Sequence, residues 1–242
     1  MLFLISLASS ILFFLIFYKA IRRKPVLSYL LTTFSVVYLF GSYLMDAYQW
    51  WPEWFMDYVV LQYSRGSLST AVFAIVMYLG VLSSKRPGVN HLKSIRGEIS
   101  IIGSILALGH NIYYGIYYFI NLFTLSGELT PPYIVATWIS ILLILIMLPL
   151  MITSFRSVRK RMRASSWKRL QQLAYPFYVL LYAHVMIVLI ANIRGTSTIL
   201  SILTYSAIFL PYFVLRALKF RKDAQLKKVR TSYGQKSSSS AA

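Results

Sequence analysis

Seven long apolar runs constrain the fold of this 242-residue chain more than any other feature of its sequence. Each run supplies close to the roughly 20 residues that a helix needs to cross a hydrocarbon core of ~30 Å. The runs are Leu2–Tyr18, Val26–Met45, Gly66–Ser84, Ile99–Phe123, Tyr133–Phe155, Leu170–Ile193 and Ser197–Leu215. Because 58% of all residues are hydrophobic, little of the chain remains for a soluble domain. The sequence predicts an all-α, polytopic membrane helix bundle of about seven transmembrane helices.

The distribution of basic residues predicts the orientation of these helices. Lys and Arg in short loops stay on the cytoplasmic side, and of the 25 basic residues only Arg65 and Arg194 fall on the opposite side. We therefore expect the N-terminus outside, the C-terminus in the cytoplasm, and a multi-pass location in a bacterial inner or plasma membrane. The positive cytoplasmic face should attract anionic lipids. The net charge of +19 does not indicate nucleic-acid binding, because the charges are spread over separate loops.

Two histidines inside apolar runs are the main indication of function. At ~1.5 Å per residue, His110 lies ~18 Å past Glu98 and His184 ~22 Å past Arg169, so both reach a similar depth. Two neutral imidazoles at matched depth can ligate one haem iron from opposite faces. The small residues Gly103 and Ala107 on the His110 face would let a flat macrocycle approach. Buried hydrogen-bonded histidines, and a proton or ion relay, remain alternatives at this point.

A family resemblance adds to this interpretation. Its residues are Thr153 and Ser154, a basic loop, Trp167 to Leu170, then Tyr175 and His184, with Arg96 fourteen residues before His110. Over approximately Met45 to Leu215 the chain resembles the ferric-reductase-like transmembrane family. Within that family it is similar to the MsrQ-type haem b subunits of bacterial protein-methionine-sulfoxide reductase systems.

The resemblance implies a haem b cytochrome that moves electrons across the membrane. The donor would be a cytoplasmic flavin reductase or the quinol pool, and the extracytoplasmic redox partner a methionine-sulfoxide reductase or ferric iron. It also implies three segments: an additional N-terminal transmembrane helix at 1–25, a six-helix haem-binding domain at 26–216, and a basic cytoplasmic tail at 217–242 that is largely disordered at its end.

One position departs from the family pattern. Where the family has a histidine in a W-x-x-L-H arrangement, this chain has Gln171, and His91 falls in a polar inner loop where solvation is expected. We therefore expect one haem, with His110 and His184 as the axial iron ligands. The inner site would instead hold FMN or a quinone headgroup near Arg96, Arg169 and Gln171.

The sequence contains no nucleotide-binding motif, so an electron-transfer role would require a separate reductant. The alternative function is a non-redox membrane protein, either a small transporter or an assembly scaffold, with structural buried histidines. A transporter would more often show two repeated halves with interrupted helices, and we find no convincing repeat.

Overall fold

The computed structural model describes residues 2–124 and 127–239, and every regular element in this part of the chain is helical. The predicted all-α class is thus confirmed. The elements in order are α1 Leu2–Arg23, α2 Pro25–Leu44, η1 Ala47–Trp50, α3 Glu53–Phe55, η2 Met56–Val60, α4 Leu61–Ser64, α5 Ser67–Val81, α6 Pro87–Ser94, α7 Arg96–His110, η3 Asn111–Gly115, α8 Ile116–Phe123, α9 Pro131–Ile152, α10 Arg156–Arg161, α11 Ala164–Gln171, α12 Ala174–Ala191 and α13 Thr196–Ser239.

The lengths and hydropathies of these helices support a multi-pass membrane protein. Within the described residues, six helical segments are long and apolar enough to cross a bilayer, and a bent pair brings the number to as many as seven. The pair joins Glu53–Ser64 to Ser67–Val81 at an angle of 56°. The predicted run Gly66–Ser84 is therefore not one straight spanning helix. Its helix α5 has 15 residues, or ~22 Å, which is too short to cross alone.

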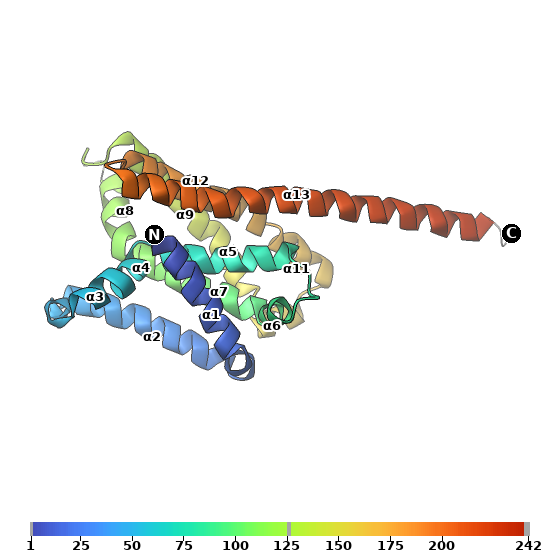
Figure 1. Cartoon of the computed structure of the whole chain (residues 1–242), viewed down its shortest axis with the longest axis horizontal. Coiled ribbons are helices and arrows are strands. Elements are labelled where there is room, and N and C mark those ends of the chain that lie inside the picture. Colours follow the sequence, from blue (N-terminus) through green and yellow to red (C-terminus); the bar gives the residue numbers. More distant parts are fainter. Residues whose placement is uncertain (1, 125–126, 240–242) are drawn as a thin grey trace.

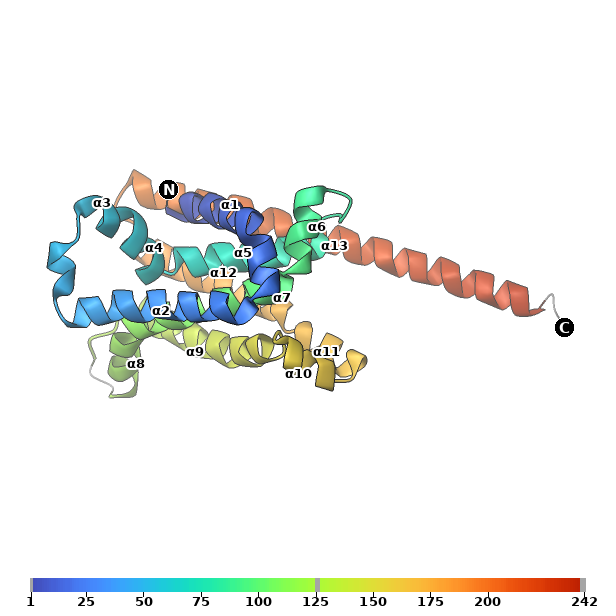
Figure 2. The same ribbon diagram turned by 90° about the horizontal axis from the view of Figure 1, so that it is seen from below.

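Helix α5 lies at the centre of the bundle because it is apolar on nearly all sides. Ala71, Ala74 and Met77 face a core cluster formed with α9, α12 and α13. Val72 and Ile75 face a second cluster formed with α1, α6 and α7. A helix that is hydrophobic all round is typical of a buried position. In both views the remaining long helices surround α5, with α2 at the periphery (Figures 1 and 2).

The predicted cytoplasmic segments gather at one end of the molecule. Figure 2 shows α6, α10 and α11 together at the end from which α13 extends, whereas α3 and α8 lie at the other end. Two of these segments contact the carboxyl end of α5. The Lys219 ammonium of α13 donates to the Gly80 carbonyl at 2.7 Å, and Lys93 of α6 donates to the Leu82 carbonyl at 2.6 Å. Lys93 and Lys219 thus lie against the carboxyl end of α5.

Helix α13 continues well beyond the predicted seventh run. It is one helix from Thr196 to Ser239 and projects from the body of the molecule (Figure 1). The helix therefore includes most of the basic tail, and the expectation of disorder towards the end of the tail stays a prediction. Lys, Gln, Arg, Ala and Leu are good helix formers, which explains the extension. The expectation for residues 240–242 lies outside the described residues.

Candidate functional site

His110 is the last residue of α7 and lies against a break in the neighbouring helix. Its Nδ1 is 2.5 Å from the Ser64 carbonyl oxygen, at the end of α4. Gly66 forms the turn between α4 and α5 with a φ of +67°, and a Cβ on Gly66 would lie 3.0 Å from Cγ of the His110 ring. A π-helical segment, η3, follows His110 directly. Such segments are frequent at functional sites.

The helix break explains the bond that His110 makes. In a continuous helix, the Ser64 carbonyl would accept the N–H of Leu68, but the turn at Gly66 separates the two helices. Among the described residues, the His110 ring is the group that donates a hydrogen bond to the Ser64 carbonyl oxygen. A carbonyl only accepts, so Nδ1 carries the proton. Nε2 of His110 is therefore left with its lone pair.

His184 lies in the middle of α12 and makes an equivalent bond. Its Nδ1 is 3.1 Å from the carbonyl oxygen of Ala136 in α9, with the Ser140 hydroxyl at 3.5 Å. The same reasoning places the proton on Nδ1 and the lone pair on Nε2. When one ring nitrogen of a histidine donates to a backbone carbonyl, the ring orientation is fixed and the other nitrogen becomes the better metal donor.

The two histidines lie on helices with shared neighbours. Their helices α7 and α12 both pack against α5 and α9. Both imidazole side chains are half-buried. Gly103 was predicted to let a flat macrocycle approach α7. In the structure a Cβ on Gly103 would lie 2.9 Å from Cγ1 of Val72, so this glycine allows α7 to pack closely on α5.

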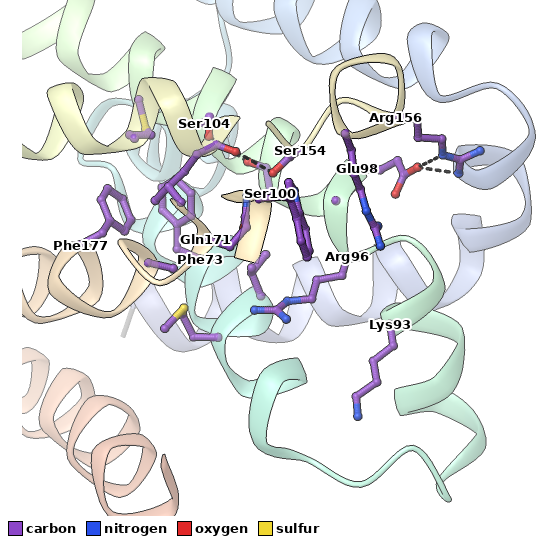
Figure 3. Close-up of a pocket in the computed structure, with 18 of the residues that line it drawn as sticks. Phe73, Lys93, Arg96, Glu98, Ser100, Ser104, Ser154, Arg156, Gln171 and Phe177 are labelled. Atoms are coloured by element: carbon purple, nitrogen blue, oxygen red, sulfur yellow. Dashed lines mark hydrogen bonds and ion pairs between the residues drawn. The ribbon is translucent and has the colours of Figure 1, made fainter. Parts of the chain in front are cut away.

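A second feature is a cavity of about 440 Å³ below the histidines, at the end of the bundle that carries the basic loops. Figure 3 shows its labelled side chains. One part is apolar, with Phe73 and Met77 from α5 and Phe177 from α12. The other part is polar and basic, with Lys93 and Arg96 among its residues. The cavity is therefore amphipathic, apolar towards the membrane interior and cationic towards the predicted cytoplasm.

The polar part of the cavity contains an ion pair. Arg156 of α10 places Nη2 at 2.5 Å and Nε at 2.7 Å from Oε1 of Glu98 in α7 (Figure 3). The Glu98 side chain is 6% exposed and the Arg156 side chain 52%. Glu98 is the acidic residue that lines this cavity within the described part of the chain. A buried carboxylate requires such a partner, since its desolvation is otherwise costly.

The cavity brings together two of the three residues predicted for the inner site. Arg96, at the start of α7, and Gln171, at the end of α11, both line it. Gln171 donates from Nε2 to the Thr153 hydroxyl at 3.0 Å. Arg169 does not line the cavity and is exposed on α11. Of the three residues predicted for the inner site, the cavity therefore brings together Arg96 and Gln171 but not Arg169.

His91 lies apart from both features. It belongs to α6, not to an irregular loop, and stacks on the ring of Tyr18 with centroids 4.3 Å apart.

Several residues of the site carried no clear signal in the sequence. Ala136 and Ser140 are ordinary small residues of an apolar run, and Ser64 is a serine just before one. Trp167 is part of the family resemblance but was not predicted as a site residue; its indole donates to the Thr153 carbonyl at 3.0 Å, and the residue lines the cavity. A glycine immediately after Arg65 was the one hint of a break beside His110, because glycine adopts positive φ without strain.

Comparison with known proteins finds similarity to one family over part of the chain. Residues 65–182 match the family model described as "Ferric reductase like transmembrane component". This segment contains Arg96, His110 and Gln171 and ends two residues before His184, and α1 and α2 lie outside it.

One relative is an uncharacterized protein from Treponema pallidum (strain Nichols). It is 40% identical over 160 residues, which cover 64% of this chain and 44% of the relative. The chain thus spans less than half the length of the relative that it matches. No solved structure matches the chain.

Proposed function

We propose that this protein is a membrane haem b subunit that transfers electrons across the membrane. The electrons would come from a cytoplasmic flavin reductase or quinol and would leave to an extracytoplasmic acceptor such as a methionine-sulfoxide reductase or ferric iron. Within the ferric-reductase-like family, this is the role of MsrQ-type subunits, which the sequence resembles.

The observation that carries this proposal is the matched hydrogen bonding of His110 and His184. Each imidazole donates from Nδ1 to a backbone carbonyl, Ser64 in one case and Ala136 in the other. Each therefore offers a neutral Nε2 lone pair, and the two rings come from helices that share the same neighbours. A neutral bis-imidazole donor set fits haem iron, which when bound supplies one-electron chemistry.

The chain's own residues would orient the ligands and keep water away from them. The carbonyls of Ser64 and Ala136 hold the ring planes, and Gly66 lets α4 and α5 approach the His110 ring. In a low-dielectric bundle, neutral ligands avoid the cost of burying a charge. Arg96 and Gln171 would hold an electron donor, FMN or a quinone headgroup, in the cavity at the cytoplasmic side.

The test is the absorption spectrum of protein expressed with haem available. We expect a low-spin haem b spectrum that sharpens on reduction with dithionite, and one haem per chain by pyridine haemochrome assay. His110→Ala and His184→Ala should each abolish the low-spin spectrum. The matched control is His91→Ala, which removes the stacked imidazole of α6 and should leave the spectrum unchanged.

A non-redox role for the histidines has one observation in its favour. His110 satisfies a carbonyl at a helix break, and an unsatisfied carbonyl within a bilayer costs several kcal/mol. A purely structural His110 would give a protein without haem that is destabilised by His110→Ala. If wild-type protein binds no haem under haem-replete conditions while both alanine variants lose stability, the structural role replaces the redox one.

A further inference from the structure

The carbonyl oxygen that orients His110 belongs to a segment with little stability of its own. Ser64 ends α4, a helix of four residues between the π-helical segment η2 and the turn at Gly66. A helix of fewer than roughly 12 residues is rarely stable without packing against its surroundings, because nucleation is costly for so few hydrogen bonds. Contacts with other helices must therefore fix the position of the Ser64 carbonyl.

Helix α1 supplies one of these contacts through a buried serine. Ser6 is 0% exposed, and its hydroxyl donates to Oε1 of Gln62 in α4 at 2.9 Å. The Ser6 hydroxyl also lies 3.1 Å from the Ser67 hydroxyl at the start of α5. Because Ser6 has one hydroxyl proton and gives it to Gln62, Ser67 is the donor in the second bond. One side chain of α1 thus joins the helices on both sides of the break.

The side-chain amide of Gln62 extends this network into the preceding segment. Its Oε1 accepts from Ser6, and its Nε2 donates to the carbonyl of Tyr58 in η2. A polar network with all its members bonded is rigid, and removing one member leaves its partners unsatisfied. Such loss is costly within a bilayer, where water does not replace the missing partner. Helix α4 is therefore held at Gln62, two residues before the carbonyl that accepts from His110.

Helix α2 holds the next residue of α4. The Ser35 hydroxyl donates to the Thr32 carbonyl within α2 at 2.8 Å, so its proton is already used. The Tyr63 hydroxyl, 3.3 Å from Oγ of Ser35, is therefore the donor in the bond between α4 and α2. Figure 2 shows α4 between α1 and α2. Neighbouring residues of α4 are thus bonded to two different helices.

The same part of α2 also packs on the helix that carries His110. A Cβ on Gly109 would lie 2.5 Å from Cγ1 of Val36, so α2 and α7 approach closely at this point. Gly109 directly precedes His110, and Val36 directly follows the serine that accepts from α4. Helix α2 therefore contacts both the segment that donates the His110 bond and the segment that accepts it.

We propose that Ser6 is a positioning residue for His110. Together with Ser35 it holds α4 between α1 and α2, and this fixes the Ser64 carbonyl that orients the imidazole. The inference rests on the proposed function for its consequence, which is that α1 and α2 set the orientation of an iron ligand. Both helices lie outside residues 65–182, the segment that matches the family model.

Packing of α1 does not depend on the Ser6 hydroxyl. Phe3 and Phe14 of α1 are 3% and 2% exposed, and Phe3 stacks on Tyr205 of α13 with ring centroids 4.0 Å apart. These aromatic contacts attach α1 to the bundle on their own. Removal of a single hydroxyl should therefore leave the helix in place, so the Ser6→Ala variant tests positioning and not folding.

The primary test is nuclear magnetic resonance of the full chain without haem, labelled with ¹⁵N-histidine, in detergent. The ring nitrogen shifts report which nitrogen of each histidine carries the proton. We expect Nδ1–H at His110 in the wild type. In Ser6→Ala the ratio of Nδ1–H to Nε2–H at His110 should fall about threefold or more, as when about half of a typical hydrogen bond is lost. The ratio at His184 should not change.

Two further variants complete this test. Gln62→Met keeps the length of the side chain and removes the acceptor of Ser6, so it should reproduce the effect of Ser6→Ala at His110. The matched control is Ser10→Ala. Ser10 lies one turn further along α1 and is 5% exposed, and among the described residues it makes no side-chain hydrogen bond. Its replacement should leave the His110 ratio unchanged.

A second measurement uses the protein loaded with haem. The electron paramagnetic resonance g-values of oxidised low-spin haem depend on the angle between the two ligand planes. We expect Ser6→Ala to shift them at unchanged haem content, and Ser10→Ala to leave them as in the wild type. If the wild type takes up no haem, the proposed function fails, while the histidine spectra still decide the role of Ser6.

Three results would overturn the positioning role. The first is a His110 proton ratio that is the same in the wild type, Ser6→Ala and Gln62→Met. The second is an equal change at His184, which would indicate a general loosening of the bundle. The third is an equal effect of Ser10→Ala, which would show that any lost hydroxyl on this face of α1 acts in the same way.

Discussion

Replacing Gly66 by alanine tests the link between the helix break and His110. Gly66 has a φ of +67°, and an L-residue in this region costs about 1–2 kcal/mol. The new Cβ would also lie 3.0 to 3.2 Å from three atoms of the His110 ring. This ring is held by its bond to Ser64, so moving it weakens a hydrogen bond worth about 1 kcal/mol. The expected total is a loss of about 2–3 kcal/mol in unfolding free energy.

Gly127 provides a matched control for this substitution. It has a similar φ of +74°, but among the described residues nothing lies within 4 Å of a Cβ there. Gly127→Ala should therefore show the backbone cost alone, about 1–2 kcal/mol at most. Unfolding of both variants is followed in detergent by circular dichroism, and haem content is measured in parallel. We expect only Gly66→Ala to lose haem. Equal stability losses and equal haem contents in the two variants would refute the argument that Gly66 positions His110.

Three further substitutions probe packing and buried polar groups. Tyr178→Phe removes a buried hydroxyl that has no hydrogen-bond partner among the described residues, and should leave the unfolding free energy unchanged or raise it by up to ~1 kcal/mol. Glu98→Gln leaves Arg156 without its carboxylate and should destabilise by about 1–2 kcal/mol, below the value for a fully buried pair because Arg156 is half-exposed; Arg156→Gln in the same chain should recover part of this loss. Gly109→Ala places a Cβ 2.5 Å from Cγ1 of Val36 and should cost about 1–3 kcal/mol through overpacking of α2 on α7. Adding Val36→Ala should restore stability, and no recovery would argue against this contact.

The spanning helices could be predicted from the sequence, because they depend on local composition. A run of about 20 apolar residues can satisfy its backbone in a bilayer only as a helix, so hydropathy predicted the spans. The depth of His110 and of His184 followed from the helical rise alone. The family match over residues 65–182 agrees with the resemblance that the sequence suggested.

The bend in the third span and the full lining of the inner cavity could not be predicted in this way. The bend at Gly66 depends on how α4 and α5 pack around the His110 ring, which involves residues 46 positions apart in the sequence. The cavity takes its lining from many separate helices, so Arg96 and Gln171 meet there while the neighbouring Arg169 points elsewhere.

The amino-acid sequence by itself determined that this protein is a bundle of membrane-spanning helices with histidines within the bilayer, since hydrophobic length and periodicity act locally along the chain. Only the tertiary structure decided which nitrogen of each histidine is free, which arginine faces a cavity, and which helix is broken. These features depend on carbonyls, guanidinium groups and side-chain volumes brought together from distant segments, and no local pattern encodes such contacts.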